Sequence, residues 1–304
     1  SYAEAGANVW ISAPAGEFCE TRTITTTDRT GGDDGYNLTG TVGDHGDTMY
    51  MQGDRNYTRC INGTSAATPA VAGVIALMLE ANPALGWRDV RLILAQTALK
   101  NDAADAGWGT TGGSPVYNFH HHYGFGVVDA QAAVALASGW TNVGTELTST
   151  TALASPTVAI PDYVSLMGPV SVSDTIAVAG SGVTRIEFVE ITFSAWDHTY
   201  SGDLEITLTS PAGTISRLAE VHACTGGCDP HNGWVFGSAR HLGENHIVAA
   251  EAQIVRRVAG VQCELGRDGL DFLDDEAAIE THALATFPDI GSGRFEECPG
   301  VGIE

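Results

Sequence analysis

Residues 62 to 69 read Asn62-Gly63-Thr64-Ser65-Ala66-Ala67-Thr68-Pro69 and lead directly into an apolar run rich in alanine and valine. A serine therefore stands where a glycine turn enters a predicted helix. Glycine permits the tight bend, and the first N–H groups of a helix have no partner within it. A hydrolase nucleophile is positioned in this way, with Ser65 attacking and the helix start facing the oxyanion. The alternative is that Thr64 or Ser65 only caps the helix, which is the commoner task of such residues.

Two helices are predicted on either side of Asn82-Pro83. Apolar residues from 70 to 79 fill a wide stripe, which indicates a helix buried on most sides. In the next segment, residues 90, 93, 94 and 97 fall at i, i+3, i+4 and i+7, which predicts a surface helix with one buried face.

The segment from Gly63 to Pro69, together with its apolar helix, closely resembles the catalytic-serine segment of the subtilase family. Trp87-Arg88-Asp89-Val90 narrows the resemblance to the kexin/furin-like branch. The resemblance implies that Ser65 is the serine of an Asp/His/Ser triad, with Gly63 and Thr64 in the nucleophile turn. It also implies an α/β subtilisin-like fold, of which residues 1–138 are the C-terminal part.

Residues 2–14 resemble a strand and turn of the family that follow its aspartate, histidine and oxyanion-hole asparagine. The other triad members are therefore expected upstream of this sequence. The chain is therefore expected to be a fragment that is inactive in isolation. Asp33-Asp34-Gly35 and His45-Gly46 resemble the family's aspartate and histidine motifs. We interpret both as loop, because they lie in a polar, glycine-rich stretch without a buried strand or helix to position them.

The same stretch predicts a calcium site as one of two alternatives. It gathers oxygen ligands of the kind calcium prefers, at Asp33, Asp34, Asp44, Asp47 and Asp54. Their spacing does not match an EF-hand, and the alternative is a solvated acidic insert. The family resemblance implies calcium dependence, and no organic cofactor is expected.

Six cysteines form an even set without the spacing of a zinc site. They are Cys19, Cys60, Cys224, Cys228, Cys263 and Cys298. In an extracellular enzyme we expect disulfides. We favour a disulfide between Cys19 and Cys60, which would join the ends of the acidic loop. Cys224 and Cys228 could close a local loop, which leaves Cys263 and Cys298 as the third pair.

The catalytic part is predicted to close with a glycine-rich turn and a helix from Asp129 to Ala137, similar to the closing helix of kexin-like enzymes. Three histidines, residues 120–122, precede it. Adjacent histidines in a loop rarely converge on one metal ion, so we interpret them as structural.

A second domain is predicted after a Ser/Thr-rich linker at residues 139–160. Residues 175–178, 186–193 and 204–209 alternate apolar and polar side chains, as half-buried antiparallel strands do. Residues 161–245 resemble the P (homo B) domain that follows kexin and furin catalytic domains, which implies an all-β jelly-roll sandwich. His198 and Asp203 fall in a strand and turn of that resemblance and are interpreted as structural.

After Glu244 the resemblance ends. Residues 246–304 contain no tryptophan and little alternation. Three alternatives stay open for this tail: a divergent sheet edge, a disordered acidic end, or a reading-frame error.

Composition limits the possible partners. The sequence has 14 basic and 37 acidic residues among 304, a net charge of −23. Such a surface repels phosphates, so nucleic acid is excluded as a partner. The acidic composition fits a secreted protein that acts on polypeptides. We expect its two domains to pack against each other, and no membrane span is expected from the sequence. The leading hypothesis is a serine endopeptidase. The alternatives are a silent scaffold whose sandwich binds a partner, and another hydrolase of the acyl-transfer type.

Overall fold

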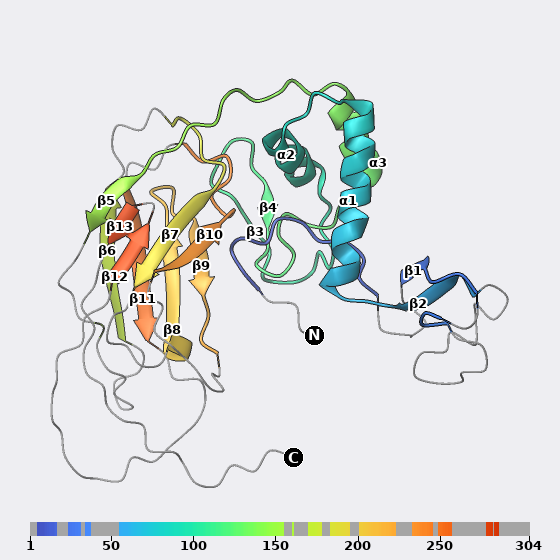
Figure 1. Ribbon diagram of the computed structural model, residues 1–304. Coiled ribbons are helices and arrows are strands. Elements are labelled where there is room, and N and C mark those ends of the chain that lie inside the picture. The colour runs from blue at the N-terminus through green and yellow to red at the C-terminus, as the bar shows by residue number, and fades with distance from the viewer. Residues whose placement is uncertain are drawn as a thin grey trace, which may run out of the picture. The chain divides into compact units, whose positions relative to one another are not determined.

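The computed structural model describes residues 5–16, 24–31, 34–37, 55–154, 160, 170–177, 183–194, 201–222, 233–245, 249–256, 278–281 and 283–285. The chain forms two compact units (Figure 1). The helical unit comprises Ser1–Ala5, Val9–Gly109 and Asn118–Thr145, and the sandwich unit comprises Gly6–Asn8, Thr110–Tyr117 and Glu146–Glu304.

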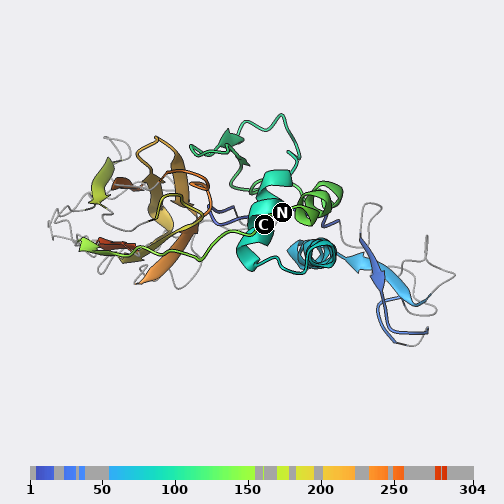
Figure 2. The same ribbon diagram turned by 90° about the horizontal axis from the view of Figure 1, so that it is seen from above.

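Three helices build the helical unit: α1 (Thr64–Ala81), α2 (Trp87–Thr97) and α3 (Ala130–Ser138). Helices α1 and α3 lie side by side (Figures 1 and 2). The core between the helices is apolar and includes Met78, Ile93, Leu94, Ala133 and Ala137. Asp129 caps α3 by accepting a hydrogen bond of 2.9 Å from the N–H of Ala132, as its position before the helix predicts.

Helix α1 corrects one expectation from the sequence. It was predicted to be buried on most sides, yet only Ala66 and Met78 are buried, and Leu77 is 50% exposed. The cause is that α1 contacts other helices through one stripe only, formed by Val71, Val74, Ile75 and Met78. By length and apolar composition alone, this helix also passes the test for a candidate membrane span, whereas no such stretch was expected.

Helix α2 agrees with its predicted pattern, and its buried residues include Val90, Ile93 and Leu94. Asp89 in its first turn is 2% exposed. The Asp89 carboxylate accepts hydrogen bonds from the N–H groups of Gly86 and Val143 and from the indole of Trp140, all at 2.8 Å. Asp89 thus fastens the chain after α3 to the start of α2.

Two short sheets accompany the helices. Strands β1 (Ile24–Thr27) and β2 (Tyr57–Ile61) pair antiparallel, and β3 (Gly109–Thr110) pairs with β4 (Asn118–Phe119). Strand β2 ends shortly before α1 begins, so it leads directly into the first turn of that helix.

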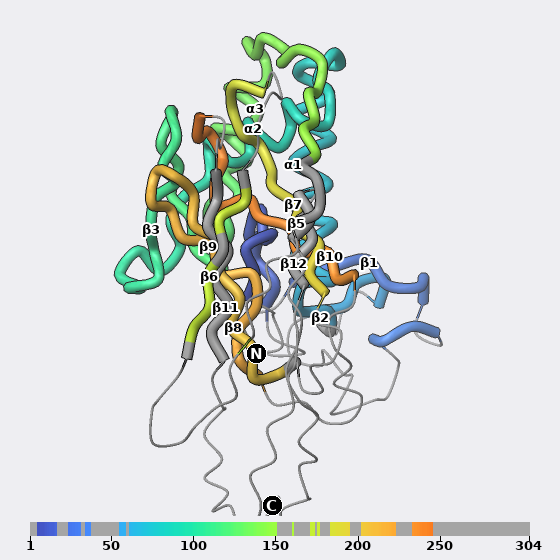
Figure 3. The backbone as a smooth tube through the Cα atoms, turned by 90° about the vertical axis from the view of Figure 1, so that its left-hand side faces the viewer, coloured from blue at the N-terminus to red at the C-terminus, as the bar shows by residue number. Residues whose placement is uncertain are grey.

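The sandwich unit contains two sheets. The first has the order β10-β7-β12-β13-β5 and the second the order β6-β11-β8-β9. Their bounds are β5 (Thr151–Ala154), β6 (Val170–Ala177), β7 (Val189–Ser194), β8 (Leu204–Thr209), β9 (Ile215–Ala219), β10 (Trp234–Ser238), β11 (Ala249–Arg256), β12 (Ala278–Thr281) and β13 (Ala283–Ala285), with a short 3-10 helix at Ser201–Asp203. In the second sheet β11 lies between β6 and β8 (Figure 3). Both sheets contribute to one apolar core, with Phe193 from β7 and Leu204, Ile206 and Leu208 from β8.

The segment after Glu244 supplies strands to both sheets. Strand β11 lies between β6 and β8 and is therefore an interior strand. Strands β12 and β13 belong to the other sheet. The sequence analysis did not predict these strands, because their residues show little alternation of apolar and polar side chains and their partners are remote in sequence.

We expect Asp89→Asn to destabilise the protein by about 1–3 kcal/mol, because three donors lose a charged acceptor in a buried place. The pKa of Asp89 lies below its ordinary value: burial acts to raise it, but the bonds from Val143, Trp140 and Gly86 and the charge of Arg88 outweigh this. The carboxylate therefore stabilises the fold fully above the unfolded pKa of about 3.9 and loses this effect as the pH falls through the folded pKa.

Urea unfolding at pH 7 and again near pH 3 measures this effect. The exposed Glu80 provides the matched control, since Glu80→Gln is expected to change stability by less than about 0.5 kcal/mol. An Asp89→Asn loss that is equally large at both pH values would contradict the assignment to the carboxylate charge.

Candidate active site

The predicted nucleophile turn joins a strand to a helix. Strand β2 ends at Ile61, and α1 begins at Thr64 after the N-cap Gly63. Gly63 has φ 72° and ψ −168°, a backbone region that is accessible in practice only to glycine. Ser65 is the second residue of the helix and is exposed. The local sequence therefore places a serine hydroxyl at the surface of a helix start.

The hydrogen bonds of this first turn decide against the capping alternative. Gly63 is the N-cap, and no side chain caps the helix. The carbonyl of Gly63 accepts the N–H groups of Ala66 at 2.9 Å and Ala67 at 3.2 Å. Among the described residues, the Ser65 hydroxyl has no hydrogen-bond partner, and the first turn carries no acidic residue. The positive end of the helix dipole at Ser65 is thus unopposed within the turn.

A base for Ser65 is not found among the described residues: no histidine or carboxylate there forms a hydrogen bond or ion pair with its hydroxyl. His45 and His198 lie outside the described residues. Asp34 is described and exposed, and its Oδ1 lies 3.9 Å from Arg29 Nη1. Asp203 is buried at the start of β8.

The calcium candidates are only partly described, since Asp33, Asp44, Asp47 and Asp54 lie outside the described residues. Within the described part of the chain, no three His, Cys, Asp or Glu side chains come together as metal ligands. The cysteine side chains at 19, 60, 224, 228, 263 and 298 also lie outside the described parts.

The carboxylate that organises the described part of the acidic loop is Asp28. It accepts the N–H groups of Arg29, Tyr36 and Asn37, each at 2.8 Å. Burial acts to raise its pKa, but the bonds from Asn37, Arg29 and Tyr36 and the charge of Arg29 lower it below its ordinary value. Sequence reasoning missed this role. An aspartate directly before a glycine-rich turn was the available signal.

The three-histidine run is divided between core and surface. His120 is 3% exposed, and its ring stacks on Tyr123 at 4.6 Å. Its Nδ1 accepts the N–H of His122 at 3.0 Å, and its Nε2 lies 3.3 Å from Asp105 Oδ1. His120 is therefore a buried histidine that packs against Tyr123, with Asp105 beside its ring. This agrees with the interpretation of residues 120–122 as structural.

Comparison with known proteins agrees with both halves of the sequence analysis. Residues 2–126 match the model of the subtilase family, and residues 186–247 match that of the proprotein convertase P-domain. Kexin of Saccharomyces cerevisiae is 34% identical over 199 residues, covering 62% of this chain and 23% of that protein. PC3-like endoprotease variant B of Hydra vulgaris is 34% identical over 194 residues, covering 62% and 26%.

Solved structures show the same fold. The serine protease of Aeromonas sobria matches with a TM-score of 0.64 and 25% identity over 93% of this chain and 52% of that one. The same protease in complex with the chaperone ORF2 matches with a TM-score of 0.66 and 24% identity over 96% and 52%. The chain thus spans about a quarter of the curated relatives and about half of these structures.

We expect Gly63→Ala to destabilise the protein by about 1–3 kcal/mol, because a Cβ is strained at this φ and ψ. Gly73 is the matched control, since it lies in the middle of α1 with no atom within 4 Å of an added Cβ. Gly73→Ala should stabilise by about 0.5–1 kcal/mol. Urea unfolding of both variants measures the difference, and two changes of the same sign would show that the backbone at Gly63 is not constrained as described.

Proposed function

We propose that this chain is the serine-bearing part of a secreted, kexin-like serine endopeptidase, because it combines a segment that matches the subtilase family with one that matches the proprotein convertase P-domain. The observation that carries the proposal is the exposed Ser65 hydroxyl in the first turn of α1, directly after Gly63 at φ 72°. A nucleophile needs this exposure, whereas a capping serine would direct its oxygen back to the helix.

The chemistry is acyl transfer to Ser65. The hydroxyl oxygen attacks the carbonyl carbon of a peptide bond and passes its proton to a histidine base, which then protonates the departing amine as the C–N bond breaks. Water hydrolyses the resulting ester by the same route and frees Ser65. The described residues contribute the nucleophile and the N–H groups and dipole of the helix start, which favour the developing negative charge.

We propose that the histidine, its aspartate and the oxyanion asparagine come from segments outside the described residues. Support comes from Ser65 lacking a histidine or carboxylate partner among those residues, and from the relatives being about four times as long as the matched part. We propose further that the 304-residue chain alone is inactive, because the resemblance to the family implies that these three residues precede the segment present here. The resemblance to the kexin/furin-like branch implies a preference for cleavage after basic residues, and we include this preference in the proposal.

Calcium dependence is part of the same proposal. The described residues do not form a calcium site, and no step of the acyl transfer described above depends on the ion. The remaining candidates lie outside the described part. Thermal unfolding with calcium, with magnesium and with a chelator would test it, and equal midpoints in all three would remove calcium from the proposal.

A second candidate function is a binding module. Strand β10 is an edge strand of its sheet, and Trp234 and Val235 on it are 57% and 55% exposed. An exposed edge with large apolar side chains suits the addition of an extended peptide. Labelling of Ser65 separates the two candidates, because a scaffold has no use for an activated serine.

Treatment with a fluorophosphonate probe and mapping of the adduct by mass spectrometry tests the proposal. In a longer protein that includes the upstream subtilase segment, we expect labelling at Ser65, loss of labelling in Ser65→Ala, and unchanged labelling in Ser138→Ala, whose hydroxyl is exposed at the end of α3. In the 304-residue chain, folded by circular dichroism, we expect no labelling.

Two results would contradict this. Labelling of the chain alone would show that a base lies within it, which overturns the split triad. Failure of the longer, folded protein to react would overturn Ser65 as nucleophile and favour the binding module.

A further inference from the structure

One short segment of the chain belongs to a different unit from the residues on either side of it. Residues 110–117 are part of the sandwich unit, whereas Gly109 and Asn118 belong to the helical unit. The segment closes the hairpin of β3 and β4.

Backbone contacts fit the segment closely to the turn that ends at Glu244. The N–H of Ser114 donates to the carbonyl of Gly243 at 2.9 Å, and the N–H of Gly112 donates to Glu244 Oε1 at 3.2 Å. A Cβ on Gly113 would overlap the carbonyl carbon of Gly243. Glycine at 113 is thus required by the close approach of two backbones.

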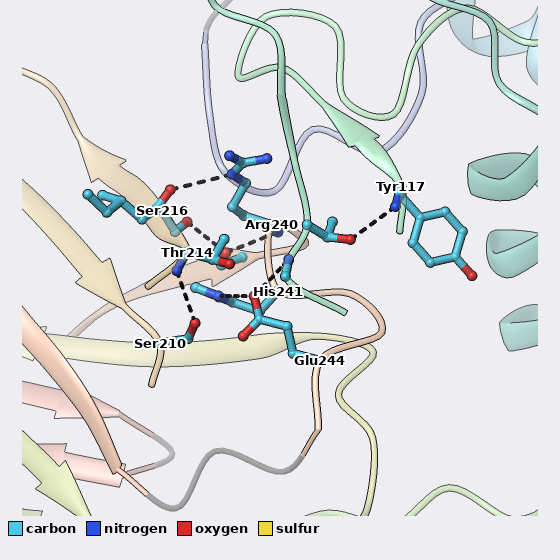
Figure 4. Close-up of polar contacts among 11 residues, drawn as sticks. Tyr117, Ser210, Thr214, Ser216, Arg240, His241 and Glu244 are labelled. Atoms are coloured by element: carbon cyan, nitrogen blue, oxygen red, sulfur yellow. Dashed lines mark hydrogen bonds and ion pairs between the residues drawn. The ribbon is translucent and has the colours of Figure 1, made fainter. Parts of the chain in front are cut away.

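Glu244 lies at the junction of three segments (Figure 4). It is 2% exposed. Besides Gly112, its carboxylate meets His241, whose Nδ1 lies 3.5 Å from Oε1, and the hydroxyls of Ser210 and Thr214 at the turn between β8 and β9. A buried carboxylate without such donors would be strongly unfavourable.

The carboxylate is ionised in the fold. Burial acts to raise its pKa, but the adjacent His241 side chain and the hydrogen bonds from the hydroxyls of Thr214 and Ser210 lower it below the ordinary value. Bonds to an ionised acceptor are the strong ones. The other charged neighbour is Arg240, whose own pKa is lowered by burial and supported by Glu244.

We propose that the buried carboxylate of Glu244 holds residues 110–117 in place within the sandwich unit, against the β8–β9 turn and the turn that ends at Glu244. One charged group accepts donors from the hairpin loop, from the β8–β9 turn and from its own turn. An apolar residue could fill the same space but would leave these donors without an acceptor.

A catalytic reading of the same residues does not fit. Ser210, His241 and Glu244 are the residue types of a hydrolase triad. They are 4%, 0% and 2% exposed, so no substrate reaches them. The Ser210 hydroxyl also accepts the N–H of Thr214 at 3.3 Å. The cluster holds segments together and does not perform chemistry.

Hydrogen exchange followed by mass spectrometry on the full chain at pH 7 tests the proposal. In Glu244→Gln we expect amides of residues 110–117 to exchange about tenfold faster or more, because the loop loses a charged acceptor. Peptides from α2 serve as an internal reference and should not change. Glu220→Gln is the matched control, since Glu220 pairs with Arg217 at the surface, and it should leave residues 110–117 unchanged.

A milder variant keeps the test informative if Glu244→Gln fails to fold. Thr214→Val removes one donor to the carboxylate while keeping the side-chain shape, and it should accelerate exchange in residues 110–117 in the same direction by a smaller factor. Unchanged exchange of the segment in a folded variant of either kind would overturn the proposal. An equal acceleration in Glu220→Gln would do so as well, because the effect would then be global.

Discussion

Buried carboxylates that collect backbone N–H groups from distant parts of the chain are the interaction on which this structure depends. Asp89 collects the N–H groups of Gly86 and Val143, which are 57 residues apart in sequence number (143 − 86). Glu244 collects the N–H of Gly112 from 132 residues away. Each acceptor remains charged in spite of burial, because its donors outweigh the cost of leaving water. An acidic chain thus uses a few of its carboxylates as internal anchors and leaves many others to the surface.

Apolar side chains are buried to different extents in the two units. The sandwich unit buries residues of both sheets in one core, whereas α1 in the helical unit packs through one stripe and leaves Leu77 and Leu79 exposed. A glycine in the middle of a helix costs about 1 kcal/mol relative to alanine. Gly73 has open space where a side chain would stand. The helix that carries Ser65 therefore gains little from its outer face within the described residues, and its start is fixed chiefly by the backbone at Gly63.

The sequence was sufficient for features that depend on near neighbours. The turn at Gly63, the helix after it, the periodic face of α2 and the cap at Asp129 all follow from residues within one or two helical turns. The alternating strands β7 and β8 were also predictable. Asp28, Glu244 and β11 were not, because their roles arise from partners remote in sequence: three N–H donors for Asp28, the 110–117 segment for Glu244, and strands on both sides for β11. Two predictions failed. The burial of α1 treated an apolar pattern as proof of a partner that covers it, and the predicted linker at residues 139–160 contains β5, whose partner β13 is remote in sequence.

The same division between local and remote applies to catalysis. A nucleophilic serine at a helix start needs only a strand, a glycine and a helix in succession, so one short motif carries the hydroxyl and the electropositive end beside it. The proton acceptor obeys no such local rule, because a histidine reaches the serine through the fold and is itself oriented by a third residue. The pair His120 and Asp105 illustrates this: an aspartate orients an imidazole, yet Tyr123 and Trp108 enclose the ring and it serves packing. Orientation of a histidine therefore becomes catalysis only where the ring also faces an exposed hydroxyl. That requirement makes Ser65 recognisable from this chain while its base must be sought elsewhere.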